Sequence, residues 1–256
     1  VAVFREVKRV LRDDGTVWLN LGDSYAGNNS RASNNGRAGF GTKREGVFTK
    51  TGTGLKTKDL VGIPWRVALA LQQDAWYLRQ DIIWHKSNPM PESVTDRCTK
   101  AHEYIFLLSK NKKYYFDNDA IKENSLNASK SISLGEKSFS KRQAEGMNVN
   151  PSGNAFSSSY KVLEKRNKRS VWTVPTKPFR DAHFATFPPD LIKPCVLAGC
   201  PEGGTVLDPF GGAGTTGLVA QQNNRDSILI ELNPDYIEIA KERLNNDAPL
   251  FNEVVA

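Results

Sequence analysis

The stretch VLDPFGGAGTT, residues 206–216, decides the fold of this chain. Its apolar residues before Asp208 predict a short strand, and the glycines after it predict a tight turn that opens a helix. Glycines at such a turn allow backbone N–H groups to approach a ligand closely. The next predicted strand, DSILIELN (226–233), carries Glu231 near its end, and an acid at this spacing suits the hydroxyls of a ribose.

A Gly-rich turn followed by an acid is not specific by itself, because dinucleotide-binding enzymes share it. In the structural alternative, Asp208 only caps the turn and Glu231 is a solvated strand end. The context of the whole DPFGGAGTT segment favours a cofactor site over that alternative.

The rest of the chain alternates between predicted helices and strands. Helices are predicted over 1–12, 60–73, 187–200, 212–222 and 234–244, and strands over 16–21, 76–86, 102–110, 203–210 and 226–233. Asp59 is expected to cap the second helix, and residues 16–21 are expected to be buried. The first helix should present one apolar face made of Val3, Phe4, Val7, Val10 and Leu11. The alternation predicts an α/β fold with a doubly wound, Rossmann-like sheet.

The net charge of +7 is concentrated in two segments with little apolar periodicity. Residues 26–58 and residues 122–169 each carry +6, which leaves −5 for the remainder. This placement suits a polyanionic partner, whereas the alternative is two solvated loops without a partner. The candidate DNA-binding residues are Arg31, Arg37, Lys43, Arg44, Lys141, Arg142, Lys165 and Arg166.

The second basic segment also suggests how the chain is divided. Residues 122–169 are polar, rich in Ser, Asn and Lys, and too long for an ordinary connection. We therefore predict a target-recognition insertion over 122–169. It would separate a first half over 1–121 from a cofactor-binding half over 170–256.

Composition excludes several classes of protein. The sequence has no apolar run long enough to span a membrane and no signal-peptide pattern at its N-terminus. Cys98, Cys195 and Cys200 suggest no disulfide framework, so we expect small hydrophobic roles for them and a reduced, cytoplasmic setting. No metal site is predicted, because no metal-like spacing is found among His85, His102 and His183.

Several motifs in one order resemble the N4-cytosine/N6-adenine DNA methyltransferases. DPFGGAGTT and ELNPDYIEIAKERL resemble the half of that family that binds S-adenosyl-L-methionine (AdoMet), and HFATFPPDLI resembles the segment packed on its methionine end. IIWHKSNPMPES and HEYIFLLSK resemble strands that lead into the target-recognition region. FREVKRVLRDDGTVWLNLGDSY resembles the helix and strand that follow the catalytic loop. The order is the permuted one, with the cofactor motif C-terminal.

The resemblance implies site-specific methyl transfer from AdoMet to cytosine N4 or adenine N6 in double-stranded DNA. It also suggests a cognate restriction endonuclease in the same system, while the recognition sequence and the oligomeric state stay open. The cofactor-binding residues that it implies are Asp208, Phe210, Gly211, Gly212, Gly214, Thr215, Thr216, Glu231 and Phe187.

The family's catalytic motif, D/S/N-P-P followed by an aromatic residue, does not occur in these 256 residues. Phe187-Pro188-Pro189-Asp190 has the proline pair without the required neighbours, so no catalytic residue is assigned. Val1 already lies within an amphipathic pattern, and we expect the motif and its strand to lie upstream. The sheet should then have a gap between the cofactor strand and residues 16–21, and the chain alone should be inactive.

Two other functions are consistent with parts of the sequence. A catalytically silent, truncated remnant would still bind AdoMet and DNA. An RNA or small-molecule methyltransferase would explain the cofactor motif, but neither IIWHKSNPMPES nor the two basic segments.

Overall fold

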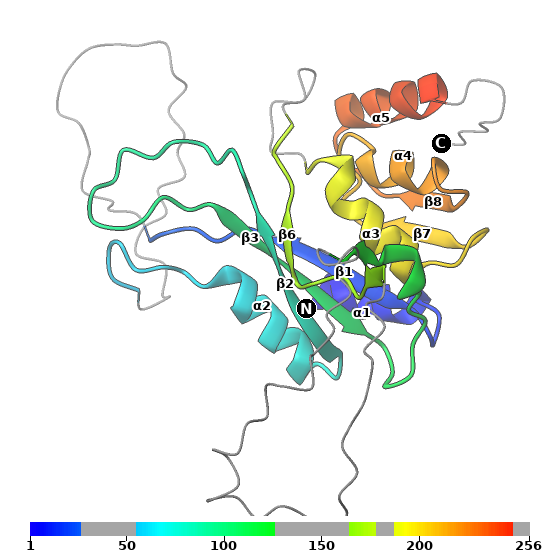
Figure 1. Ribbon diagram of the computed structural model, residues 1–256, viewed down its shortest axis with the longest axis horizontal. Coiled ribbons are helices and arrows are strands. Elements are labelled where there is room, and N and C mark those ends of the chain that lie inside the picture. Colours follow the sequence, from blue (N-terminus) through cyan, green and yellow to red (C-terminus); the bar gives the residue numbers. More distant parts are fainter. Residues whose placement is uncertain (27–54, 126–163, 178–186, 248–256) are drawn as a thin grey trace, which may run out of the picture. The chain divides into compact units, whose positions relative to one another are not determined.

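The computed structural model describes residues 1–26, 55–125, 164–177 and 187–247 (Figure 1). These residues belong to two compact units, which we describe separately. The first unit comprises Val1–Asp117 and Arg169–Ala256, and the second comprises Asn118–Lys168. No helix within the described ranges combines the length and the apolar character needed to cross a membrane.

A four-stranded sheet forms the centre of the first unit. Its strands are β1 (Thr16–Leu21), β2 (Tyr77–His85), β3 (His102–Ser109) and β6 (Val171–Thr173), in the order β1-β3-β2-β6. Strand β3 runs antiparallel to β1 and β2, and β6 runs parallel to β2. The carboxyl ends of β1, β2 and β6 therefore meet at one edge of the sheet.

The two faces of this sheet bury different side chains because successive residues of a strand point to opposite sides. On one face, Phe106 and Leu108 pack with α1 (Ala2–Val10) and α2 (Ile63–Gln73). On the other face, Ile105 and Trp84 pack with α3 (Pro189–Gly199). Helices thus cover both faces, as the doubly wound architecture requires.

The cofactor half supplies a second sheet. Strands β7 (Thr205–Asp208) and β8 (Asp226–Leu229) are parallel, and α4 (Thr215–Gln221) crosses between them, followed by α5 (Pro234–Asp247). Within the described residues, β7 pairs only with β8, and β1 pairs only with β3. The two sheets therefore share no strand pair there, and this is the gap expected between the cofactor strand and residues 16–21.

The second unit is described only at its two ends. It contains a 3-10 helix, η1 (Asp119–Ile121), and a short antiparallel pair of β4 (Glu123–Asn124) with β5 (Lys165–Arg166). The proposed division into 1–121, 122–169 and 170–256 stays a prediction.

Three local expectations were wrong. Val3 and Val10 are exposed, because they lie on one flank of the apolar stripe of α1, while Phe4, Val7 and Leu11 at its centre contact the core. Strand β1 is only half-buried along its length, which is consistent with the lack of a paired strand, within the described residues, on its side away from β3. Cys98 is exposed rather than a small core residue, because it lies in the connection between β2 and β3.

The capping residue of α2 was also predicted wrongly. Asp59 does not cap this helix; its carboxylate accepts a hydrogen bond from Lys56 N at 2.8 Å. The Asp23 carboxylate instead accepts hydrogen bonds from Gly62 N at 3.1 Å and Ile63 N at 3.0 Å. A residue at the end of β1 therefore satisfies the first amides of a helix some 40 positions later. Sequence-local capping rules cannot identify such a partner.

Candidate functional site

The two predicted carboxylates converge on the glycine-rich turn after β7. Asp208 accepts hydrogen bonds from Phe210 N at 3.0 Å and from Thr216 Oγ1 at 2.5 Å. Glu231 accepts hydrogen bonds from Gly212 N at 2.8 Å and from Leu232 N and Asn233 N, both at 2.9 Å. The structural role considered for Asp208 is therefore real, since its carboxylate caps the turn. Glu231 is not merely a solvated strand end, because its carboxylate accepts hydrogen bonds from three backbone amides. A second role in binding a ligand remains compatible with these bonds.

Hydrogen bonds from the backbone also stabilise the ionised form of Glu231. The amide of Asn233 has the largest effect and, together with those of Gly212 and Leu232, lowers the pKa of the Glu231 carboxyl below its ordinary value. Glu231 is thus ionised at neutral pH, and an ionised carboxylate is a strong acceptor for hydroxyl groups.

The glycines of the turn have different structural roles. A Cβ on Gly214, whose φ is +75°, would lie 2.8 Å from the Cβ of Ala240, so glycine is needed for α4 to approach α5. A Cβ on Gly211 would lie 3.0 Å from the Cβ of Leu229. Among the described residues, a Cβ on Gly212 would meet nothing closer than Phe210 O at 3.9 Å. The backbone of Gly212 therefore faces open space, which a ligand can occupy.

Exposed apolar side chains adjoin the Glu231 carboxylate. Leu232, three residues after the end of β8, is 94% exposed, and Phe210 and Ile230 are also exposed. An uncharged aromatic base could cover such side chains, while Glu231 accepts from hydroxyl groups. The residues present thus fit a nucleoside such as that of AdoMet. Leu232 and Ile230 were missed from the sequence because an apolar residue near a strand end normally indicates core.

Arg243 on α5 supports the turn from the side of the helices and was also missed. It donates hydrogen bonds to Ala213 O at 2.5 Å and to Thr215 Oγ1 at 3.2 Å, and burial lowers its pKa. Thr215 is buried by this contact. Arg243 thus provides hydrogen-bond donors for the carbonyl of Ala213 and the hydroxyl of Thr215 at the start of α4. The only sequence signal was a basic residue on the helix predicted over 234–244.

The remaining predicted residues are distributed more widely. Phe187 packs against the core cluster that contains Trp84 and Leu191, and its contact with AdoMet stays a prediction. Arg166 forms an ion pair with Glu123 at 2.8 Å, which engages part of its charge, while Lys165 is exposed. The other predicted DNA contacts lie outside the described residues, namely Arg31, Arg37, Lys43, Arg44, Lys141 and Arg142.

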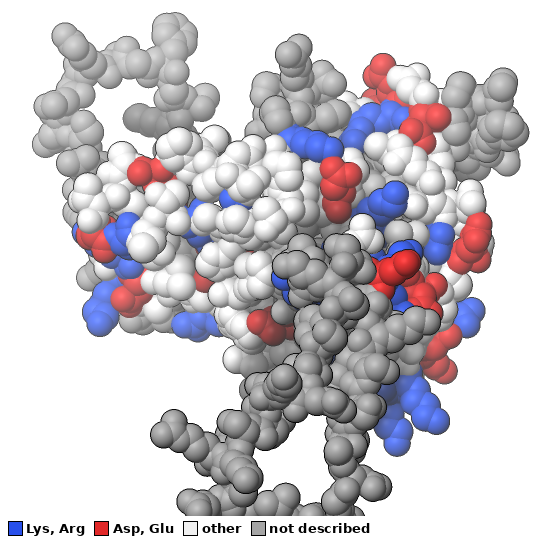
Figure 2. All heavy atoms as spheres, in the orientation of Figure 1, with Lys and Arg blue, Asp and Glu red and all other residues white. Residues whose placement is uncertain are grey.

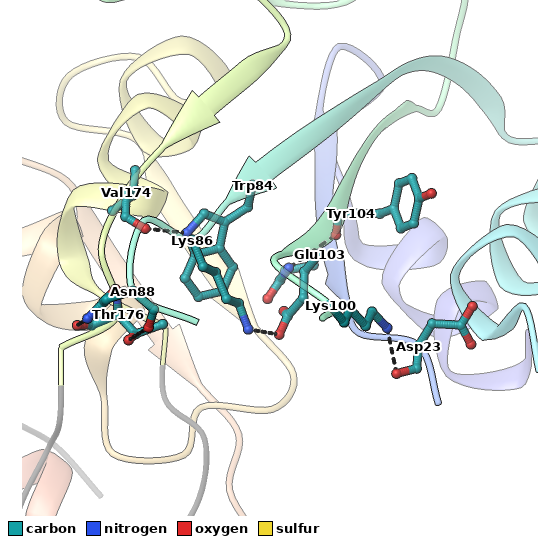
Figure 3. A network of polar contacts seen from close by, with 10 residues as sticks. Asp23, Trp84, Lys86, Asn88, Lys100, Glu103, Tyr104, Val174 and Thr176 are labelled. Carbon is teal, nitrogen blue, oxygen red and sulfur yellow. Dashed lines mark hydrogen bonds and ion pairs between the residues drawn. The ribbon is translucent and has the colours of Figure 1, made fainter. Parts of the chain in front are cut away.

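A second polar cluster occupies the carboxyl edge of the four-stranded sheet (Figure 3). Lys86 pairs with Glu103 at 2.5 Å and lies 4.6 Å from the ring centroid of Trp84. The Trp84 indole donates to Val174 O at 2.8 Å. Side-chain contacts therefore join β2, β3 and β6 at the edge where β2 and β6 end and β3 begins.

The same cluster fixes the loops that leave this edge. Lys100 donates from Nζ to Asp23 O at 2.6 Å, and burial lowers the pKa of Lys100. Asn88 and Thr176 are joined by two hydrogen bonds, from Asn88 Nδ2 to Thr176 O at 3.1 Å and from Thr176 N to Asn88 Oδ1 at 2.8 Å. The loops after β1, β2 and β6 are thus held at defined positions.

The fold and the turn define an α/β protein with a nucleoside-type cofactor site. The chain belongs to the DNA methylase family, whose profile (N6_N4_Mtase) matches residues 1–242.

Curated relatives support this assignment along nearly the whole chain. The Type II methyltransferase M.Cfr9I of Citrobacter freundii is 45% identical over 249 residues, which is 96% of this chain and 70% of the relative. The Type II methyltransferase M.XycI of Xanthomonas campestris pv. cyanopsidis is 46% identical over 246 residues, 95% of this chain and 69% of the relative.

Solved structures show the same fold. The PvuII DNA methyltransferase (cytosine-N4-specific) aligns with a TM-score of 0.59 at 15% identity, covering 100% of this chain and 70% of that one. TTHA0409 of Thermus thermophilus, solved in complex with S-adenosyl-L-methionine, aligns with a TM-score of 0.55 at 20% identity. That alignment covers 99% of this chain and 78% of TTHA0409.

The chain is therefore a site-specific DNA methyltransferase that uses AdoMet and acts on an exocyclic amino nitrogen of cytosine or adenine. The silent remnant is not favoured. Glycine spacing alone could not have decided this, because Gly212, Gly214 and Gly217 also fit the dinucleotide pattern G-x-G-x-x-G.

Proposed function

We propose that residues 208–216 and Glu231 hold AdoMet. The observation that carries this proposal is the open space at Gly212 beside an ionised carboxylate and the exposed side chain of Leu232. Glu231 would accept from the ribose hydroxyls, and Leu232, with Phe210 and Ile230, would cover the adenine. When bound, AdoMet supplies a methyl group on a sulfonium that is already a good leaving group.

The target base must leave the duplex, because its amino group is otherwise engaged in pairing. The carboxyl edge of the four-stranded sheet is where we place the flipped base, since ligands of open α/β sheets bind outside the carboxyl ends of the strands. The chain's task there is positioning, which brings the amino nitrogen in line with the methyl group. No catalytic residue is assigned.

Double-stranded DNA would be held largely by the two basic segments. The described Lys and Arg residues visible in Figure 2 are interspersed with Asp and Glu. The segments 27–54 and 126–163, by contrast, carry +4 and +3, which together equal the net charge of the whole chain. Six of the eight predicted DNA-binding residues fall within them, and the other two are Lys165 and Arg166. A cognate restriction endonuclease, suggested by the family resemblance, and a cytoplasmic location, suggested by the cysteine pattern, complete the proposal.

Transfer of tritium from labelled AdoMet tests the function directly. The relatives matched along nearly the whole chain run against the expectation, drawn from the absent catalytic motif, that the chain alone is inactive. The purified protein, mixed-sequence double-stranded DNA and labelled AdoMet are therefore expected to give labelled DNA, with RNA unlabelled. Mass spectrometry of the digested DNA then distinguishes N4-methylcytosine from N6-methyladenine. Labelled RNA would contradict the assignment, and intact AdoMet binding without any transfer would restore the silent remnant.

Replacing Glu231 with alanine should weaken AdoMet binding by about 1–3 kcal/mol, because the ribose acceptor is lost. Titration calorimetry at neutral pH measures this, and wild-type affinity in Glu231→Ala would rule out Glu231 as the ribose ligand. The matched control is Glu238→Ala on α5, which removes an exposed carboxylate and should leave the affinity unchanged.

The lowered pKa of Glu231 adds a pH dependence. Its stabilising effect on the turn is present above the ordinary glutamate pKa and is lost as the pH falls through the lower, folded-state pKa. The acid side of the unfolding curve should therefore be flatter in Glu231→Gln than in wild type. Urea unfolding at a series of acidic pH values measures the difference.

DNA affinity should depend strongly on salt. If about six phosphates are neutralised, the slope of log affinity against log salt concentration should be about −5. Fluorescence anisotropy with a labelled duplex measures this slope. A slope near zero, or wild-type affinity after deletion of residues 126–163, would reject the electrostatic role of the basic segments.

A further inference from the structure

Met90 is the most unusual apolar side chain at the carboxyl edge of the sheet. It is 86% exposed, and it stands between Pro89 and Pro91 in the connection from β2 to β3. Each proline fixes its own φ, and Pro91 also restricts Met90 to extended backbone. A single exposed methionine is ordinary on a surface. An exposed methionine whose backbone is restricted by a proline on each side is less common.

Side-chain contacts anchor the chain before Met90. Asn88 makes the two hydrogen bonds with Thr176 described above, and Thr176 Oγ1 also donates to Asn88 O at 3.5 Å (Figure 3). The anchor lies where β2 and β6 end, and both strands belong to the same sheet. Asn88, two positions before Met90, is therefore fixed to the loop that leaves β6.

A second anchor follows Met90. The Glu92 carboxylate accepts hydrogen bonds from Arg97 Nη1 at 2.6 Å and from Lys100 N at 3.3 Å. Because Lys100 is itself bonded to Asp23 O, this anchor leads back to the end of β1. Met90 thus lies in a short loop segment, which we call the arch (residues 88–92), whose two end residues are both anchored by hydrogen bonds.

The connection from β2 to β3 also contacts the residues that flank segment 27–54 on both sides. The guanidinium of Arg97 lies 4.0 Å from the ring centroid of Tyr25, just before residues 27–54. Lys58 Nζ, just after them, pairs with Asp96 Oδ2 at 2.6 Å. Ala26 and Asp59 are themselves paired through the backbone at 2.8 Å. The segment proposed to contact phosphates therefore leaves and re-enters the fold beside the arch.

We propose that Met90 is a wedge that enters the DNA base stack and fills the space left by the flipped target base. This inference rests on the proposed function, since it needs a base-flipping enzyme. Extrusion of a base leaves an unstacked step, and apolar side chains such as methionine occupy steps of this kind in other DNA-bending proteins. The fixed arch reduces the ordering cost that insertion would otherwise carry.

The test measures binding to DNA that already has a gap in its stack. Fluorescence anisotropy compares a short synthetic duplex that contains one abasic site with the intact duplex of the same sequence. Wild type should prefer the abasic duplex, and Met90→Ala should lose about tenfold of that preference, because its apolar contact is gone. Met90→Leu should retain it. Val94→Ala is the matched control, since Val94 is a 40% exposed apolar residue of the same connection.

Each outcome decides one point. Equal preference in wild type and Met90→Ala, or no preference in wild type, would overturn the wedge. If Met90→Leu loses the abasic preference as Met90→Ala does, an apolar side chain at position 90 is not sufficient. That result would contradict the wedge as stated. Abasic preference that depends on Met90, without methyl transfer in the tritium assay, would overturn the proposed function and, with it, the role of Met90 in base flipping; only the insertion of Met90 into a gap in the stack would remain. Circular dichroism melting should show all three variants folded, because both positions are exposed.

Discussion

Alanine at position 214 is expected to lower the free energy of unfolding by about 2–5 kcal/mol and to abolish measurable AdoMet binding. Two costs add up: a side chain at positive φ costs about 1–2 kcal/mol, and overpacking a tight contact costs about 1–3 kcal/mol. The new Cβ would have to push Ala240 away, and α5 with it, since the two Cβ atoms would lie 2.8 Å apart. The turn that α4 follows would move as well. Urea unfolding and calorimetry measure the two effects.

Gly203 offers a matched control for the conformational cost. Its φ is +72°, almost that of Gly214, but an added Cβ would meet nothing within 4 Å. Gly203→Ala should therefore cost only about 1–2 kcal/mol, and AdoMet affinity should be unchanged. Equal losses in both variants would show that backbone strain, rather than the contact with Ala240, explains the need for Gly214.

Truncating Phe106 should have an effect of similar size on the other sheet. Phe106 is fully buried on β3, with its ring centroid 5.1 Å from that of Trp65 and 5.9 Å from that of Tyr104. Phe106→Ala leaves a cavity at this aromatic cluster and should destabilise the protein by about 3–5 kcal/mol. Tyr77→Ala removes an exposed aromatic ring of neighbouring β2 and should change stability by only about 0.5 kcal/mol. Thermal and urea unfolding would show the contrast, and similar losses in both variants would contradict the burial argument.

Hydrophobic periodicity was sufficient for most elements of this fold. The strands over 76–86 and 102–110 and the helix over 187–200 were predicted to within a few residues of β2, β3 and α3. Each has a strong local pattern, and each is bounded by turn residues. Strand order and the pairing of β2 with β6 could not be predicted, since they depend on contacts between segments almost 90 residues apart.

The candidate site divides in the same way. Asp208, Glu231 and the glycines belong to one contiguous motif, so their convergence followed from a strand, a turn and a second strand. Arg243 and the cap of α2 by Asp23 could not be found, because a side chain that serves a distant backbone leaves no periodic signal. The backbone bonds that lower the pKa of Glu231 could likewise not be predicted from the sequence.

The two separate sheets have a consequence for hydrogen exchange. Within the described residues, β1 has β3 on one side only and β7 has β8 on one side only, so alternate amides along each strand point to an edge without a partner. Deuterium uptake should therefore alternate along β1 with a period of two, slow where an amide donates to β3 and fast at the residues between. Slow uptake at every residue of β1 would mean that another strand, from whatever source, is paired along that edge.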